Sequence, residues 1–294
     1  MNDDDILAAT RSNYCIGYRE LPREAELVQV VRYCETMRRH FTPIAKAFTA
    51  EDNSRWLLRH YLAIKFAAAA SLLAGSAQYA FERNLLTAVP YFNYYALLSA
   101  CRAFLLTSPL LAWDGEKTVE MTHENILNRT AEAMRALDPD RRVAWRKEMA
   151  DLRNRRELFS YRFPLSGPDF IGRDAFDPDR ATRLTRLIAE LAALNSECFD
   201  GVLSKHVGEE MPVVALPDHD WAEAYKLAGE TESDAADRHR FGKLRRQWKT
   251  VSPLHVMTSD GLMDDLFGSW CDPDSIAGDE GFDPDDYSSY ILWF

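Results

Sequence analysis

Apolar residues in this chain recur at spacings of three and four, and the alternation typical of strands is nearly absent. Because an α-helix turns once in about 3.6 residues, such residues share one helix face. The first series contains Leu27, Val30, Val31, Cys34, Met37, Phe41, Ile44 and Phe48. This spacing predicts an all-α protein in which amphipathic helices pack around a common core.

Prolines and short polar residues mark the helix boundaries. Pro90 precedes one apolar segment and Pro109 follows it, as expected at the first position of a helix and beyond its last turn. The pairs Asp138-Pro139 and Asp177-Pro178 each read as an N-cap followed by the first helical residue. Six helices are predicted, over about 27–48, 54–82, 91–107, 119–137, 139–163 and 178–206. This number of helices indicates a bundle.

The chain changes character after Val207, so we expect the bundle to occupy residues 1–208. A proline-bounded linker, Met211–Pro217, leads to a polar, partly basic helix predicted over Trp221–Lys249, which places the second segment at 209–259. From Asp260 onward there are ten acidic residues and no basic ones, yet the last four residues, 291–294, are apolar. The third segment, 260–294, is therefore predicted to be an acidic tail whose end docks on the bundle or on a protein partner.

The composition limits the functions to consider. A net charge of −11 argues against a protein coated with nucleic acid, so any such contact must be local. Five scattered cysteines and an acidic N-terminus favour the cytoplasm. The stretch Leu62–Phe81 is interrupted by Lys65 and Gln78, which favours a core helix over a membrane span. The spacing of His, Cys, Asp and Glu does not match a metal site, and the sequence contains no nucleotide-binding motif, so neither a metal nor a cofactor is predicted.

The most unusual segment is Arg153–Arg162, with four arginines, Asn154 and Tyr161 in ten residues. Residues 141–162 carry eight basic and three acidic side chains, a local charge of +5. Because the net charge of the whole chain is −11, the remaining residues together carry −16. Arg153, Asn154 and Arg156 fall within one helical turn, where guanidinium groups could hold a phosphate and an amide could orient it. The alternative is a solvated helix face with Arg–Glu pairs, each contributing at most about 0.5 kcal/mol.

The run Tyr91–Leu106, YFNYYALLSACRAFLL, resembles the second conserved helix of HEPN domains, helical bundles of prokaryotic toxin–antitoxin, CRISPR-associated and antiphage systems. In that family an arginine and a polar residue are followed, a few positions on, by a histidine and then often a tyrosine. Arg153-Asn154 and Tyr161 match this pattern, and the resemblance covers about residues 54–206. It implies a dimer with a composite cleft, and metal-independent ribonuclease chemistry in which the 2′-hydroxyl attacks the adjacent phosphate. In some relatives the trailing tyrosine is nucleotidylated, which makes Tyr161 a candidate for modification.

The chain departs from that pattern at the histidine. Phe159 occupies the expected position, flanked by Leu158 and Ser160, and none of the three exchanges a proton near neutral pH. The unperturbed pKa of tyrosine, about 10, makes Tyr161 a poor substitute. Other histidines stand on predicted helices: His60, His206 and His123, of which His123 is the first to test because a loop precedes it.

The sequence therefore predicts a cytoplasmic conflict or defence component whose arginine-rich helix binds RNA or another phosphate-bearing ligand. The predicted site residues are Arg153, Asn154, Arg156 and Tyr161, and endoribonuclease activity is left open. The expected assembly is a homodimer or a subunit of a larger complex. The alternative is a catalytically silent scaffold that binds protein partners through its basic helix and its tail.

Overall fold

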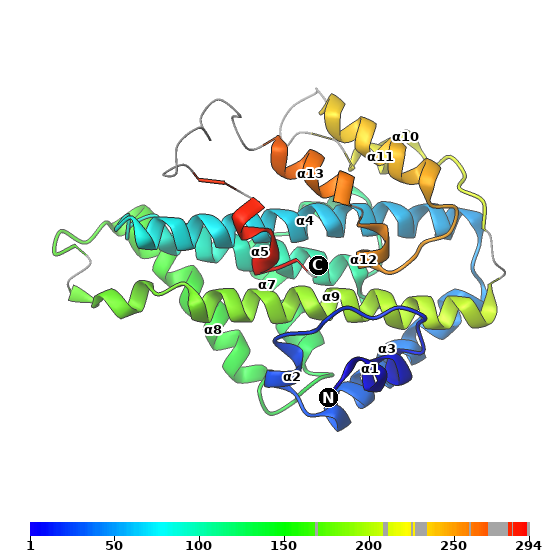
Figure 1. Cartoon of the computed structure of the whole chain (residues 1–294), viewed down its shortest axis with the longest axis horizontal. Coiled ribbons are helices and arrows are strands. Elements are labelled where there is room, and N and C mark those ends of the chain that lie inside the picture. The colour runs from blue at the N-terminus through cyan, green and yellow to red at the C-terminus, as the bar shows by residue number, and fades with distance from the viewer. Residues whose placement is uncertain are drawn as a thin grey trace.

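The computed structural model describes residues 1–167, 170–207, 211–224, 226, 234–258, 260–269, 282–283 and 285–292. Within these residues the fold is all-α, as the sequence predicts, with thirteen α-helices and no strand (Figure 1). Six helices build the bundle: α3 (Leu27–Lys46), α4 (Ala50–Glu82), α5 (Val89–Thr107), α7 (His123–Met134), α8 (Arg142–Glu157) and α9 (Asp179–His206). The prediction of about six bundle helices is therefore confirmed.

Helices α4, α5 and α9 form the centre of the bundle. Figure 1 shows α4 and α9 running along its long axis, with α8 crossing at one end and α3 at the other. Small residues of α4, such as Ala63, Ala67 and Ala70, are completely buried and let the neighbouring helices approach closely. The shorter helices α1 (Asp3–Thr10) and α2 (Leu21–Glu24) precede α3 in sequence, and α6 (Glu116–Val119) lies between α5 and α7. The result is one large apolar core, with a smaller second cluster beside it.

The predicted starts of the bundle helices lie within four residues of the observed ones. Thr49 and Asp52 form a capping box that starts α4 at Ala50, four residues before the predicted start. The prediction at Asp138 is wrong in detail. Its carboxylate accepts from the backbone N–H groups of Asp140, at 2.9 Å, and Arg141, at 3.3 Å, in a turn, and α8 begins only at Arg142.

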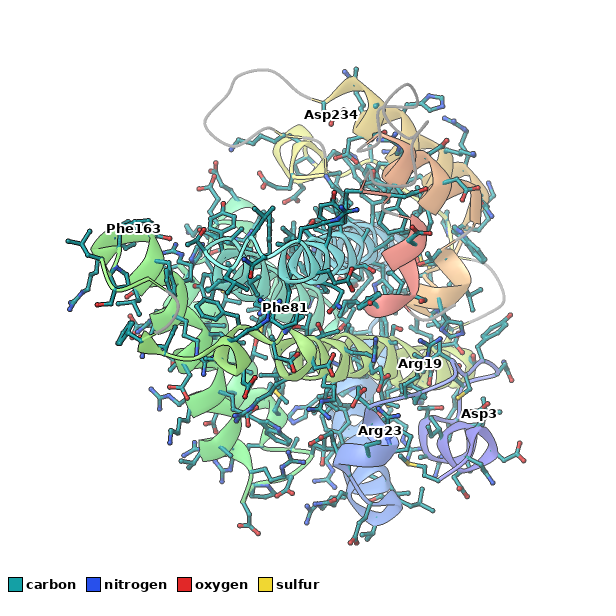
Figure 2. The ribbon with its side chains drawn as sticks, turned by 60° about the vertical axis from the view of Figure 1, so that its left-hand side comes forward. Asp3, Arg19, Arg23, Phe81, Phe163 and Asp234 are labelled. Atoms are coloured by element: carbon teal, nitrogen blue, oxygen red, sulfur yellow. The ribbon has the colours of Figure 1, made fainter. Side chains whose placement is uncertain are left out.

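Helix α8 stops before Pro164, as predicted. Its last turn widens into a π-helical segment, Leu158–Arg162 (η1), which ends at Phe163 in the left-handed backbone region (φ 34°, ψ 80°). This change of pitch turns the chain away from the bundle. Phe163 is labelled in Figure 2 at the outer edge of the molecule.

The segment after residue 210 is built differently from the single helix predicted over Trp221–Lys249. Helix α10 (Asp218–Ala222) ends in a turn, and α11 (Ala235–Gln247) starts separately, capped by Asp234. Polar residues with weak periodicity cannot sustain a long helix without a packed face. Helix α11 is fixed by the buried carboxylate of Asp237, which accepts hydrogen bonds from Tyr61 and Lys65 of α4.

Helices α12 (Leu254–Met257) and α13 (Asp260–Gly268) and the 3-10 turn η4 (Asp285–Tyr290) follow. The prediction that the apolar end docks is confirmed for Ile291 and Leu292, which are buried in the core of the same chain. Arg186 of α9 donates from Nε to the Tyr290 carbonyl at 2.5 Å and helps to hold this end in place. Residues 270–281, which include part of the acidic segment, and Trp293 and Phe294 lie outside the described residues.

Helix α4 is also the helix that, among the described residues, is long and apolar enough to cross a membrane. About 72% of its most apolar stretch is buried within the bundle, however. The apolar surface of α4 therefore packs in the core, as predicted from the interruptions at Lys65 and Gln78. It contacts α5, α9 and the C-terminal segments.

Candidate functional site

Helix α5 presents a tyrosine face toward the end of α8. Tyr91 and Tyr95 stand one turn apart, with ring centroids 4.6 Å from each other, and Tyr94 packs edge-on against Tyr95. Seven residues beyond Tyr95 on the same face lies Arg102, the single charged residue of α5. Its guanidinium group is stacked over the ring of Phe66 of α4, at 5.2 Å.

Arg156 of α8 inserts into this face. It donates from Nη2 to the hydroxyl of Tyr95 at 2.9 Å and from Nη1 to the hydroxyl of Tyr161 at 3.3 Å. Its guanidinium carbon also lies over three rings, 5.3 Å from that of Tyr94, 5.5 Å from Tyr95 and 5.3 Å from Tyr161. Neutral phenols therefore orient the guanidinium group and leave its positive charge uncompensated.

His123, the first residue of α7, completes the arrangement. Its Nδ1 lies 3.1 Å from the hydroxyl of Tyr94, and its ring packs 5.8 Å from the rings of both Tyr94 and Tyr95. Thr122 caps the helix and so fixes the backbone at this position. The contact through Nδ1 leaves Nε2 as the nitrogen available to a ligand. We call Tyr94, Tyr95, Arg102, His123, Arg156 and Tyr161 the Arg156 cluster.

The charges in the Arg156 cluster are unbalanced. Among the described residues, no carboxylate lies within ion-pair distance of Arg102 or Arg156, and the Nε of each is buried without a hydrogen-bond partner. Burial, together with the positive charges of Arg102 and Arg156, lowers the pKa of His123 below its usual 6.5. The imidazole is thus neutral at physiological pH and able to accept a proton. Such a site attracts anions.

Burial raises the pKa of Tyr94 to about 12, although Arg156 opposes this shift. The phenol therefore keeps its proton at neutral pH and acts as a hydrogen-bonding partner of His123 and not as a base. Within the part of the chain that the structure describes, no three His, Cys, Asp or Glu side chains gather as metal ligands would. The chemistry open to the residues of this cluster is anion binding by guanidinium groups, with a histidine to move protons.

The four residues predicted from sequence are only partly brought together. Arg156 and Tyr161 contact each other within the cluster. Arg153 points along the neighbouring groove between α7 and α8 and lies 3.7 Å from the carboxylate of Glu157, so part of its charge is offset. Asn154 is exposed and lies on a different face of the helix from Arg156.

Arg155, the remaining arginine in this turn, leaves the site altogether. It donates a hydrogen bond to the carbonyl of Ala175 on the opposite side of α8. The segment that reads as one basic cluster in the sequence thus sends its arginines to two sides of the helix. Sequence spacing alone does not show which arginines face the site, because this depends on which helices pack against each side of α8.

The histidine position of the family pattern does not face the cluster. Phe159 is buried, with its ring 5.5 Å from that of Phe176, in a small apolar core formed by the end of α4, the start of α5 and the segment that precedes α9. A histidine there would point into that core. His60 is buried in α4 with its pKa lowered to about 3 by burial, and His206 is exposed at the end of α9. His123 is therefore the histidine that the fold brings to Arg156.

Sequence reasoning missed Tyr94, Tyr95 and Arg102 as site residues because they stand in a run that reads as core. One signal was available: a lone arginine in an otherwise uncharged helix of 19 residues, in line with two tyrosines. A charge in such a helix is rarely retained without a partner or a ligand.

Comparison with known proteins does not assign this chain to a family: no family profile, curated protein or solved structure matches it. The fold and the site define it only as an all-α bundle with an arginine–histidine–tyrosine cluster between α5, α7 and α8.

Proposed function

We propose that this protein binds RNA, through its phosphate groups, at the Arg156 cluster, as a cytoplasmic component of a conflict or defence system. The HEPN-like sequence features of α5 and α8 suggest the biological setting, and the scattered cysteines favour the cytoplasm. The observation that carries the proposal is the pair of guanidinium groups, Arg102 and Arg156, that flank a neutral histidine without a carboxylate partner among the described residues.

Each part of the cluster has a role in this proposal. Arg156 would hold a phosphate through N–H groups not used by the tyrosines, and Arg102 would add a second positive charge. Tyr161, which is 75% exposed, would stack on a base or donate a hydrogen bond to the backbone. An RNA loop or single strand fits this combination better than a duplex, because its bases are free to stack on aromatic rings.

The same geometry gives the cluster the parts needed for metal-independent cleavage. The 2′-hydroxyl would lose its proton to Nε2 of His123 while its oxygen forms a bond to the adjacent phosphorus. The bond from phosphorus to the 5′-oxygen would then break, and this oxygen would leave with the proton returned by the imidazolium. Arg156 and Arg102 would stabilise the charge that develops on the phosphate oxygens.

The proposal is tested by comparing Arg156→Ala and Arg102→Ala with Arg155→Ala as the matched control. Arg155 is on the same turn of α8 but faces the other side. Loss of one charge-assisted contact should weaken RNA binding about tenfold to a hundredfold for the two site variants. The control should stay within about threefold of wild type. Equal losses in all three variants would refute the assignment of the site.

Cleavage is tested separately with His123→Ala and His123→Gln in the presence of a chelator. If wild type cleaves RNA, both variants should lose cleavage but retain binding, because the arginines remain. Binding without cleavage in wild type would restrict the function to recognition.

One observation favours the scaffold as a second candidate. The segment after the cluster exposes large apolar side chains, namely Phe163 at 62%, Leu165 at 99% and Phe170 at 57%. Exposed apolar groups of this size often contact a partner, either a second copy in a homodimer or another subunit of a larger complex. If Phe163→Ser/Leu165→Ser abolishes a complex that Arg156→Ala leaves intact, the scaffold explains the protein better.

A further inference from the structure

A second basic surface lies far from the Arg156 cluster, between the C-terminal halves of α3 and α9. It is a groove enclosing about 890 Å³ of open space. Five cations line it, together with one carboxylate, that of Glu35: Arg11, Arg38, Arg39, Lys46 and Lys205. We call this surface the α3/α9 groove. In a protein with a net charge of −11, such a concentration of positive charge runs against the average composition.

The cations of this groove are unpaired. Among the described residues none of the five lies within ion-pair distance of a carboxylate, although Glu35 is one helical turn from Arg38 and Arg39. Several basic side chains elsewhere on the surface do have an acidic partner, as in the pair Arg55–Glu51. Nη1 of Arg38 is also buried without a hydrogen-bond partner in the described structure. An unsatisfied guanidinium donor in a groove is suited to an anionic ligand.

Close contacts between α3, α9 and the end of α1 form this groove. Stacking of Phe41 on Phe199, with ring centroids 4.6 Å apart, fixes α3 against α9 beneath it. At Gly201 the end of α1 crosses so closely that a Cβ atom would lie 2.5 Å from the carbonyl oxygen of Thr10. Glycine therefore permits the approach that brings Arg11, in the left-handed region at φ 62°, to the edge of the groove.

Stabilisation of helix ends explains only part of this charge. Lys46 and Lys205 lie in the last turns of α3 and α9, where cations offset the helix dipole. Arg38 and Arg39 lie about two turns before the end of α3, and Arg11 follows α1. The helix dipoles therefore do not account for these three arginines, and a bound anion would.

The chemistry of the lining favours a regular polyanion over a protein segment. Apart from Val202 and Gly201, the groove is lined by polar and charged residues, so it lacks the apolar pocket that usually anchors a peptide. Arginine-rich surfaces recognise phosphates through paired N–H groups. We propose that the α3/α9 groove binds the phosphodiester backbone of a single-stranded nucleic acid, as a site separate from the Arg156 cluster.

The two sites lie toward opposite ends of α9. Arg180, in the first turn of α9, donates a hydrogen bond to Glu148 of α8, the helix that carries Arg156, whereas Val202 lines the α3/α9 groove. Twenty-two residues of helix separate them, which corresponds to about 30 Å. The two sites can therefore be tested independently, and a single long strand could contact both.

The test uses the exposed triple variant Arg39→Gln/Lys46→Gln/Lys205→Gln. The control, Lys117→Gln/Arg129→Gln/Arg135→Gln, removes the same charge from exposed positions on α6, on α7 and just after α7. Binding of fluorescent oligouridylate and oligothymidylate is measured over a range of salt concentrations, with thermal unfolding to confirm the fold. Each lost phosphate contact should reduce the slope of log K against log salt by about 0.7, so the triple variant should lose about 2 from the slope and bind about tenfold more weakly. The control should retain the slope of wild type.

An unchanged slope in the folded triple variant would overturn the proposal, as would tighter binding of polyglutamate than of either oligonucleotide. Repeating the measurement in an Arg102→Ala/Arg156→Ala background separates the two sites. The groove predicts the same loss of slope there. Equal affinity for the RNA and DNA probes supports recognition of the backbone. If the triple variant lost slope only in the Arg102→Ala/Arg156→Ala background, the proposal of a separate site would be overturned.

Discussion

Replacing Glu197 by glutamine is expected to change the dependence of stability on pH. Glu197 lies in the C-terminal half of α9, and its side chain is completely buried. One oxygen accepts from the backbone N–H of Ile16 at 3.3 Å, and the hydroxyl of Tyr18 also interacts with the carboxylate, yet these contacts do not offset its burial. Burial raises the pKa of Glu197 to about 8. It also lowers the pKa of the adjacent His255 to about 4, so His255 supplies no compensating charge at neutral pH.

The magnitude follows from proton linkage. The carboxyl pKa is about 8 in the folded protein and 4.5 as its ordinary value, so between these limits the folded state binds the extra proton. Stability from this group is full below about pH 4.5 and is lost as the pH rises toward 8. Each pKa unit corresponds to about 1.4 kcal/mol, so the loss over this window is on the order of 5 kcal/mol. That is a large part of the 5–15 kcal/mol that stabilises a typical domain.

The assay is urea unfolding of wild type and Glu197→Gln at several pH values from about 5 to about 8. Glutamine does not ionise, so the variant should lack this decline and become more stable than wild type toward pH 8. The control, Glu124→Gln, makes the same chemical change at an exposed position. Parallel curves for wild type and Glu197→Gln would refute the reasoning, because they would show that Glu197 titrates alike in the folded and unfolded chains.

Three other substitutions test the architecture. Asp237→Ala leaves a lysine of α4 without its carboxylate partner and should cost about 3–5 kcal/mol in urea unfolding, with earlier proteolysis around α11. Gly201→Ala places a methyl group against the end of α1 and should lower the free energy of unfolding by about 1–3 kcal/mol, whereas Gly242→Ala, where the nearest atom is 3.5 Å away, should not. Tyr95→Phe removes a hydroxyl that orients Arg156 and should weaken RNA binding about twofold to tenfold without a comparable loss of stability.

The fold was predictable because its signals are local. Apolar spacing and the prolines at 90 and 164 locate the six bundle helices to within a few residues, although neither Asp138 nor Asp177 is the N-cap that the sequence predicts. The prediction failed over Trp221–Lys249, where polar residues give no strong period and tertiary contacts such as that of Asp237 decide which part is helical.

The candidate site was predictable only in part because it joins three helices. Arg156 and Tyr161 were found from their own segment, and His123 from its position at a helix start. Whether they meet depends on how α5, α7 and α8 pack, which sequence spacing does not encode. Arg102 could have been recognised as an isolated charge in an apolar helix, but its neighbours could not.

The uneven charge of this protein should also shape its response to salt. Residues 141–162 carry +5 while the remainder carries −16, so a phosphate ligand is attracted locally and repelled at longer range. At about 0.01 M salt the Debye length is about 30 Å and the ligand senses both, whereas at 0.15 M it is about 8 Å and the nearest charges dominate. Affinity should therefore rise less steeply below about 0.05 M salt than counterion release from the contacts alone predicts. A log–log plot that stays linear down to 0.01 M would show that distant acidic groups do not oppose binding.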